Sequence, residues 1–251
     1  MIRLAIDSGL ATVTLDRPPV NVLTTAMMRD LAGALRKTGA EPSVRVVRLD
    51  AVGKTFSAGV DVGEHLGSLL PEMMSALADL FLAFEEVPHP IVAVVQGAAL
   101  GGGLEVVLGC DLVVASERAT FGQPEIKLGV FAPPATVLLP RRIGLGPATA
   151  LLLTGESIDA AEARRLGLVN EVFPIEGFEA AASVWIAKLC SLSGAALRRA
   201  KRALRAASGH HVREAHERMH DIYMNDLMAT EDAQEGLRAF VEKRAAAWKH
   251  R

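Results

Sequence analysis

The stretch IVAVVQGAALGGGLE, residues 91–105, decides the fold of this chain. Its first five residues are continuously apolar and lie between Pro90 and Gly97, as in a strand that is buried on both faces. Three glycines, Gly101–Gly103, then lead into Leu104–Leu108, which has the pattern of a helix. Glycines let the backbone approach a ligand closely, and the first turn of a helix leaves its N–H groups free. We therefore predict a buried strand, a ligand-facing turn and a helix.

Strands and helices alternate around this stretch. The predicted elements are a hairpin over residues 2–15 with a turn at Ser8-Gly9, a helix from Thr25, a strand at Val44–Leu49, a helix from Pro71 and a strand at Leu112–Ala115. Such alternation implies βαβ crossovers and a mainly parallel sheet. From Phe178 onward the pattern predicts only helices, at residues 178–189, 195–207, 212–227 and 233–248. The chain thus divides into an α/β core, residues 1–190, and a helical C-terminal region, residues 191–251.

The composition excludes several classes of protein. The 251 residues include 27 Lys and Arg against 29 Asp and Glu, so no electrostatic argument favours a nucleic-acid partner. Cys110 and Cys190 lie in apolar surroundings and are too few for a disulfide framework or a structural zinc site. The N-terminus lacks a signal-peptide core, and no run of about 18 apolar residues predicts a membrane span. We expect a soluble, cytoplasmic protein.

Two acidic residues follow turns at which chemistry could take place. Glu105 falls in the first turn of the helix after the glycines, and Glu125 follows Pro124 at the start of another predicted helical turn. A third turn, Thr55–Asp61, also follows a strand. An acid in a first helical turn equally fits a plain interaction with the helix dipole. Spacing alone leaves open whether the two carboxyl groups meet.

Two other patterns have simpler explanations. Residues 216–220, HERMH, match the H-E-x-x-H zinc motif, but no third ligand follows, and the charged face of an amphipathic helix explains them. We expect no metal. A basic cluster on one predicted helix fits either a solvated face or contacts with phosphates of a small ligand; it consists of Arg198, Arg199, Lys201, Arg202 and Arg205.

At these turns the chain resembles the crotonase (enoyl-CoA hydratase/isomerase) superfamily over nearly its whole length. Six segments carry the resemblance in order: Arg17–Leu23, Lys54–Asp61, Gly97–Asp111, Phe121–Gly129, Thr154–Val169 and Ala233–Arg244. The resemblance implies an α/β spiral of ββα repeats with a C-terminal helical trimerisation region, assembled as a homotrimer or a dimer of trimers. It also implies an acyl-CoA substrate, an enolate intermediate and no cofactor beyond the coenzyme A of that substrate.

The resemblance also implies roles for particular residues. The backbone N–H groups of Val60 and Gly102 correspond to the oxyanion hole, in which two fixed donors favour a developing negative charge. Glu105 and Glu125 match the two acids of the family's hydratases. Two carboxyl groups that hold one water can supply both the acid and the base for hydration. Glu105 is implied to position and activate that water, and Glu125 to deliver the proton to the α-carbon.

The coenzyme A moiety is implied to lie along the Thr55–Asp61 turn, with its adenine beside Ser57 and Ala58. Phe240 and Lys243 match family residues that reach the coenzyme, often from a neighbouring subunit. Lys243 equally fits a solvated helix lysine.

The run Gly129–Thr136 suggests which kind of acyl group the substrate carries. In this run Pro133 and Pro134 replace the glycines of ordinary family hydratases. This run and the tripeptide at residues 64–66 are similar to the cyclohexa-1,5-diene-1-carbonyl-CoA hydratases, although Asp61 agrees with the general family. The prolines predict a stiff pocket wall. Phe131 fits a flat surface in the substrate pocket or a core position, and His65 fits the substrate entrance or a solvated helix start. We predict a cyclic or branched enoyl- or dienoyl-CoA substrate.

Other functions remain open at this stage. Within the superfamily the alternatives are a double-bond isomerase, a dehalogenase or a thioester hydrolase, and the presence of both glutamates favours hydration over these. A different class is a non-catalytic scaffold that binds acyl-CoA or RNA. The intact glycines and acids argue against a scaffold, and the near-neutral charge argues against RNA.

Overall fold

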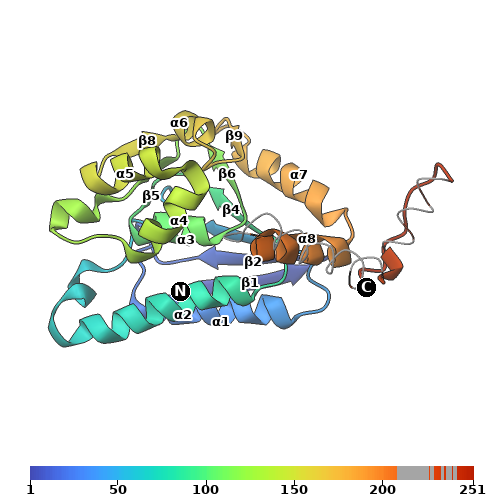
Figure 1. The fold of residues 1–251 in the computed structure, drawn as a ribbon, viewed down its shortest axis with the longest axis horizontal. Coiled ribbons are helices and arrows are strands. Elements are labelled where there is room, and N and C mark those ends of the chain that lie inside the picture. Colours follow the sequence, from blue (N-terminus) through green and yellow to red (C-terminus); the bar gives the residue numbers. More distant parts are fainter. Residues whose placement is uncertain (208–225, 227–228, 233–234, 236–238, 240–241) are drawn as a thin grey trace.

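The computed structural model describes residues 1–207, 226, 229–232, 235, 239 and 242–251 (Figure 1). A six-stranded sheet in the order β1-β2-β3-β4-β6-β9 lies at its centre. Strands β1 and β2 are antiparallel, and all other neighbours are parallel. The strands span Ile2–Asp7 (β1), Leu10–Leu15 (β2), Val46–Ala51 (β3), Ile91–Val95 (β4), Leu112–Ser116 (β6) and Glu171–Phe173 (β9). The predicted hairpin and mainly parallel sheet are confirmed.

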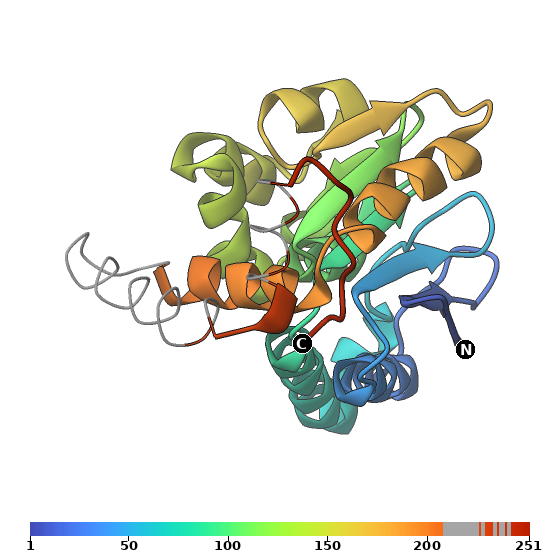
Figure 2. The ribbon, with the colours of Figure 1, turned by 90° about the vertical axis from the view of Figure 1, so that its right-hand side faces the viewer.

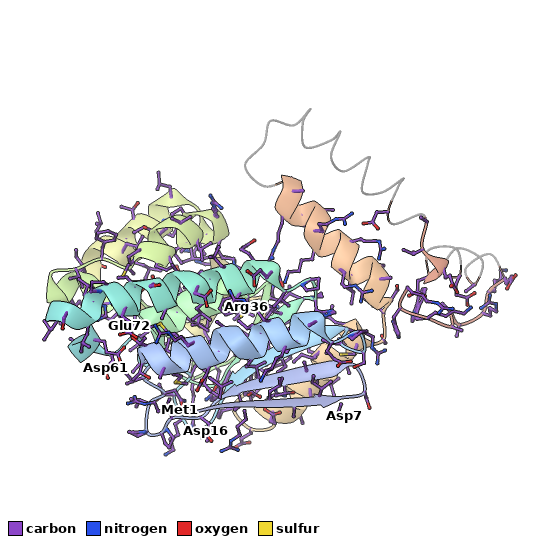
Figure 3. The ribbon with its side chains drawn as sticks, turned by 90° about the horizontal axis from the view of Figure 1, so that it is seen from below. Met1, Asp7, Asp16, Arg36, Asp61 and Glu72 are labelled. Carbon is purple, nitrogen blue, oxygen red and sulfur yellow. The ribbon has the colours of Figure 1, made fainter. Side chains whose placement is uncertain are left out.

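Helices cover both faces of this sheet (Figure 2). Helices α1, Thr25–Ala40, and α2, Leu70–Glu86, lie side by side on one face (Figure 3). Successive strand residues point to opposite faces, so Val47 joins the large core on the α1–α2 side, whereas Val46 packs in a smaller cluster with α7, Phe178–Cys190. A strand that is covered on both sides must be continuously apolar, as β4 is.

A small second sheet positions the turns of interest. It consists of β5, Ala99–Leu100, β7, Thr120–Gly122, and β8, Ser157–Asp159, in that order. Ser57 forms an isolated bridge with Ala99, which holds the turn after β3 against the start of α3, Gly102–Gly109. A β-carbon on Gly97 would lie 1.8 Å from the carbonyl oxygen of Lys54, so this approach requires glycine.

The remaining short elements cover the end of the sheet that carries these turns. They are the helices α4, Pro133–Ile143, α5, Leu145–Thr154, and α6, Ala160–Arg165, and the 3₁₀ turns η1, Val62–His65, η2, Gly67–Leu69, and η3, Pro124–Leu128. Helix α4 packs against α3, and η3 against α5. These two contacts bring the turn after β7 next to the glycine-rich turn.

By length and composition alone, Gly67–Glu86 could cross a membrane. Within the fold, Met73, Leu77 and Leu80 of this segment are buried in the core. Three of its acids pair with α1, as in the ion pair between Arg29 and Glu72 at 2.8 Å. Core packing therefore accounts for one side of this apolar helix, whereas Leu70, Met74 and Leu82 are exposed.

Helix α8, Gly194–Ala207, does not present its basic cluster simply to solvent. Lys201 is 6 % exposed, and its ammonium lies 2.6 Å from Asp111 and donates to the carbonyl of His89 at 2.7 Å. Arg199 pairs with Asp226 at 2.8 Å, and Arg205 donates to the carbonyl of Glu85. The solvated alternative is wrong for Lys201, because it overlooked acceptors on other elements.

The C-terminal region departs in part from the predicted helices. Residues 208–225 and the H-E-x-x-H pattern lie outside the described residues. The predicted helix over 233–248 is wrong for residues 242–248, which form a turn and an irregular segment. There Glu235 accepts the backbone N–H of Ala247 at 2.8 Å, and Asp232 accepts that of Lys249 at 2.6 Å. Side-chain acceptors take the N–H groups that a helix would use.

Candidate active site

Glu105 is a buried carboxyl group in the first turn of α3. It is 2 % exposed, although a carboxyl group is rarely buried without a partner. Its Oε1 accepts the backbone N–H of Ala135, in the first turn of α4, at 3.0 Å. The packing of α4 on α3 thus brings a helix N-terminus to this carboxyl group.

Glu125 approaches the same place from η3. The N–H of Gly101 donates to the carbonyl of Gly122 at 2.9 Å, which ties the end of β7 to the turn before α3. A β-carbon on Gly101 would lie 2.6 Å from Oε1 of Glu125, so the glycine leaves room for the carboxyl group. The buried amide of Gln123 donates to Oε1 and Oε2 of Glu125 at 3.1 and 2.9 Å. The sequence analysis did not select Gln123. Its position next to Pro124-Glu125 is the one feature of the sequence that could have identified it.

The backbone N–H groups of two neighbouring residues, Val60 and Gly102, lie beside these acids. A β-carbon on Gly102 would lie 3.1 Å from the backbone nitrogen of Val60. Leu23 pairs with Gly59 and Asp61, on either side of Val60, and Gly102 begins α3. Within the described part of the chain, no protein acceptor receives the N–H of Val60 or Gly102. Both donors are therefore free for an oxygen of a ligand.

Comparison with known proteins identifies the family that has this arrangement. A family model described as enoyl-CoA hydratase/isomerase matches residues 5–251. The chain belongs to the enoyl-CoA hydratase/isomerase family. It is 42 % identical over 246 residues to a cyclohexa-1,5-dienecarbonyl-CoA hydratase of Thauera aromatica, covering 98 % of this chain and 95 % of that one. It is 34 % identical to a 2,3-dehydroadipyl-CoA hydratase of Escherichia coli, covering 95 % and 94 %.

Solved structures of the family have the same fold. The enoyl-CoA hydratase of Bacillus anthracis superimposes with a TM-score of 0.92 at 32 % identity, over 100 % of this chain and 99 % of that one. An enoyl-CoA hydratase of Mycobacterium smegmatis superimposes with a TM-score of 0.93 at 32 % identity, over 98 % of both chains. The predicted crotonase fold is confirmed.

Burial raises the affinity of both glutamates for a proton. Burial raises the pKa of Glu105 to about 8; the Ala135 N–H opposes this shift, and the charge of Glu125 adds to it. Burial also raises the pKa of Glu125, against the influence of the nearby His65. At neutral pH we therefore expect a proton on Glu105.

The raised pKa of Glu105 predicts a pH-dependent stability. Between its ordinary pKa of 4.5 and the folded value of about 8, the folded protein binds a proton that the unfolded chain releases. Stability therefore falls as pH rises through this range. Glu105→Gln keeps an uncharged group of similar size, so we expect its stability advantage over wild type to grow from pH 4.5 to pH 8. Urea unfolding at several pH values measures this, and a constant difference would contradict it.

The turn η1 is anchored to α1 by a residue that the sequence did not single out for this role. Glu64 accepts the backbone N–H and the hydroxyl of Thr25, each at 2.6 Å. The next residue, His65, has its Nδ1 3.0 Å from the carbonyl oxygen of Asp61. A carbonyl only accepts hydrogen bonds, so Nδ1 is the donor in this contact. His65 is partly buried and acts electrostatically on Glu125. Its place at the substrate entrance or as a solvated histidine at a helix start stays a prediction.

The predicted coenzyme-binding residues are placed only in part. Ser57 is buried, and its hydroxyl donates to the carbonyl of Asn21 at 2.8 Å, whereas Ala58 is exposed. Lys243 is exposed in a turn. The segment 242–251 that contains it lies at the opposite end of the molecule from the segment of η1 (Figure 1). Phe240 lies outside the described residues. The binding of coenzyme A by these four residues stays a prediction.

The segment after Glu125 is apolar and open. Phe131 is 65 % exposed and Leu128 62 %, and Leu66 of the η1–η2 segment is 69 % exposed. The core alternative for Phe131 is therefore wrong. These exposed apolar residues lie on the segments that carry Glu125 and His65, and they are available to contact an acyl group.

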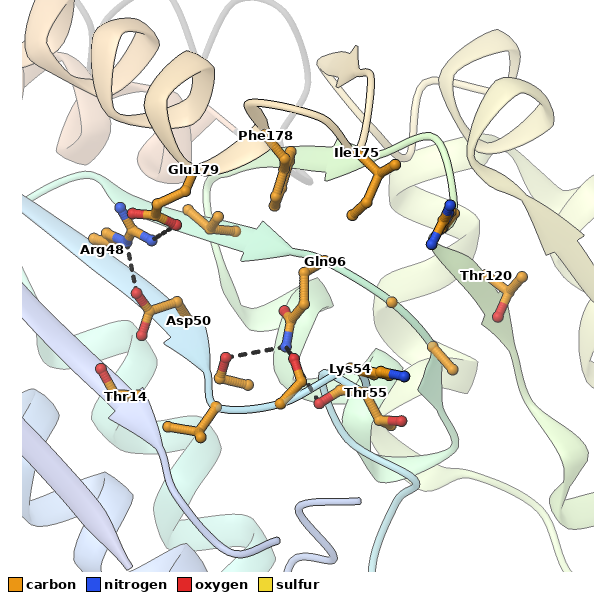
Figure 4. Close-up of a pocket in the computed structure, with 17 residues that line it drawn as sticks. Thr14, Arg48, Asp50, Lys54, Thr55, Gln96, Thr120, Ile175, Phe178 and Glu179 are labelled. Atoms are coloured by element: carbon orange, nitrogen blue, oxygen red, sulfur yellow. Dashed lines mark hydrogen bonds and ion pairs between the residues drawn. The ribbon is translucent and has the colours of Figure 1, made fainter. Parts of the chain in front are cut away.

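A separate cavity of about 820 Å³ lies between β3, β4 and the start of α7 (Figure 4). Its lining includes neither Glu105 nor Glu125. Buried Arg48 pairs there with Asp50 at 2.7 Å and with Glu179 at 2.6 Å, and Gln96 donates to nearby backbone carbonyls. The described residues hold no group of three or more His, Cys, Asp and Glu that could bind a metal. The acids of this cavity thus serve to neutralise Arg48.

Proposed function

We propose that this enzyme adds water across the double bond of a cyclic or branched 2-enoyl- or dienoyl-CoA, using Glu105 and Glu125. The observation that carries the proposal is the convergence of two carboxyl groups beside two unpaired backbone N–H groups. Such donors stabilise the charge that develops on a thioester oxygen. The family and its hydratase relatives support the same reaction.

In this proposal the two glutamates have different roles. Glu105, protonated at neutral pH, holds the water by a hydrogen bond. Glu125, as a carboxylate held by Gln123, takes a proton from that water while the water oxygen adds to the β-carbon. Glu125 then gives this proton to the α-carbon of the enolate. The N–H groups of Val60 and Gly102 hold the enolate oxygen, and every proton in the sequence comes from water.

The same proposal assigns the coenzyme site to an assembly of subunits. Ser57 and Ala58 would meet the nucleotide on one subunit, and Phe240 and Lys243 would come from another. The position of the segment 242–251 supports this, because it lies at the opposite end of the molecule from η1 (Figure 1). We propose a homotrimer or a dimer of trimers, with residues 191–251 as the trimerisation region, acting in the cytoplasm.

We expect a cyclic acyl group to be preferred. Exposed Phe131 offers a flat apolar surface, the prolines after it stiffen the wall, and the relative from Thauera aromatica is named for a cyclic dienoyl-CoA. Cyclohexadienecarbonyl-CoA should therefore have a higher kcat/KM than crotonyl-CoA or a longer linear enoyl-CoA. A well-fitted hydrophobic contact is worth about 10-fold or more in such a comparison. Steady-state kinetics with the three substrates test this, and an equally large preference for the linear ones would contradict it.

A further inference from the structure

The N-terminus of α4 lacks backbone N–H groups that other helices have there. A helix ordinarily begins with three or four N–H groups that have no partner in the helix. Here Pro133 and Pro134 occupy the first two positions and have no N–H. The first helical hydrogen bond runs from Thr136 to Ala132 at 3.0 Å. Among the first three helical positions only Ala135 has an N–H, and it donates to Glu105.

A capping oxygen at a helix N-terminus accepts from the N–H group of the second or the third position, so both donors are ordinarily on offer. Each donor favours the charged form of the carboxylate. We propose that Pro134 is a positioning residue: by withholding the second N–H, it leaves Glu105 with one backbone donor and so keeps this carboxyl group protonated at neutral pH. The consequence for catalysis rests on the function proposed above.

No other nearby charge can replace this effect. In the described structure, the charged group that acts on Glu105 is Glu125 of η3, which in turn faces His65 of η1. Three acids of α2 pair with arginines of α1, and the fourth, Glu85, pairs with Arg205 of α8. On α4 itself, Arg141 and Arg142 lie in the last turn, and β5 has no charged residue. Backbone donors of α4 are therefore the available means of stabilising a charge on Glu105.

The test is a titration of Glu105 by NMR in protein labelled with ¹³C at the glutamate carboxyl groups, with the signal assigned by its loss in Glu105→Gln. Pro134→Ala restores the second N–H, so the midpoint should move to lower pH by about 1–2 units, as expected for one added hydrogen bond to a charged group. Pro140→Ala is the matched control, because this proline lies in the same helix but far from its N-terminus. Its midpoint should stay at the wild-type value.

An unchanged midpoint in folded Pro134→Ala, or an equal shift in Pro140→Ala, would overturn the proposal. If Pro134→Ala does not fold, Ala135→Pro removes the single donor and should move the midpoint upward; no movement there would be equally decisive against it. The titration needs no turnover. A shifted midpoint in a protein that hydrates no enoyl-CoA would leave this inference intact and refute the proposed function, whereas in an active hydratase the alkaline limb of kcat/KM should follow the midpoint.

Discussion

Replacing Glu125 by glutamine will lower kcat for hydration by about 10³-fold, and replacing Glu105 will lower it by about 10²-fold, within the usual range for lost acid–base groups. An amide at position 125 can neither take a proton from water nor return one to carbon. An amide at position 105 can still hold the water, so its loss is smaller. Steady-state assays of the conjugated thioester at saturating substrate measure both effects.

The control for this pair is Glu176→Gln, which makes the same change at an exposed position and should keep wild-type activity. Binding of a non-reactive acyl-CoA by the two site variants should also be close to wild type. Near-wild-type hydration by either folded variant would remove that glutamate from the mechanism.

The second large effect concerns a backbone group. Gly102→Pro removes one oxyanion donor and should lower kcat by about 10²–10³-fold. Gly102 occupies the first position of α3, where proline fits the backbone. Any side chain there crowds Val60, because a β-carbon would lie 2.5 Å from its Cγ2.

Gly102→Ala is therefore the matched control, because it introduces the same β-carbon and keeps the N–H. The ratio of the two activities separates the effect of losing the N–H donor from the effect of crowding Val60. If the alanine and proline variants were equally active, the N–H of Gly102 would have no part in stabilising the transition state.

The elements that sequence could predict are those with strong local patterns. The unbroken apolar run at 91–95 is β4, and the Ser8-Gly9 turn closes the hairpin because both residues have positive φ. Glu105 and Glu125 could be named because glycines and a proline mark the helical starts that carry them. The local sequence is therefore sufficient to predict these elements and these two residues.

What sequence could not give depends on contacts between distant segments. The hydrogen bonds from Ala135 to Glu105 and from Thr25 to Glu64 join residues 30 and 39 positions apart, and neither has a local signal. The burial of Lys201 likewise depends on Asp111. Proton affinities follow from such burial and from such donors, so they become readable only when the fold is known.

The most direct test of the account is mass spectrometry of cyclohexadienecarbonyl-CoA after incubation with the purified protein in ¹⁸O-labelled water. The account predicts a product that has gained one water and carries the label in its acyl part, formed by wild type and by Glu176→Gln but not at a comparable rate by Glu125→Gln. Release of free coenzyme A, a product of unchanged mass, or unreacted substrate would contradict it.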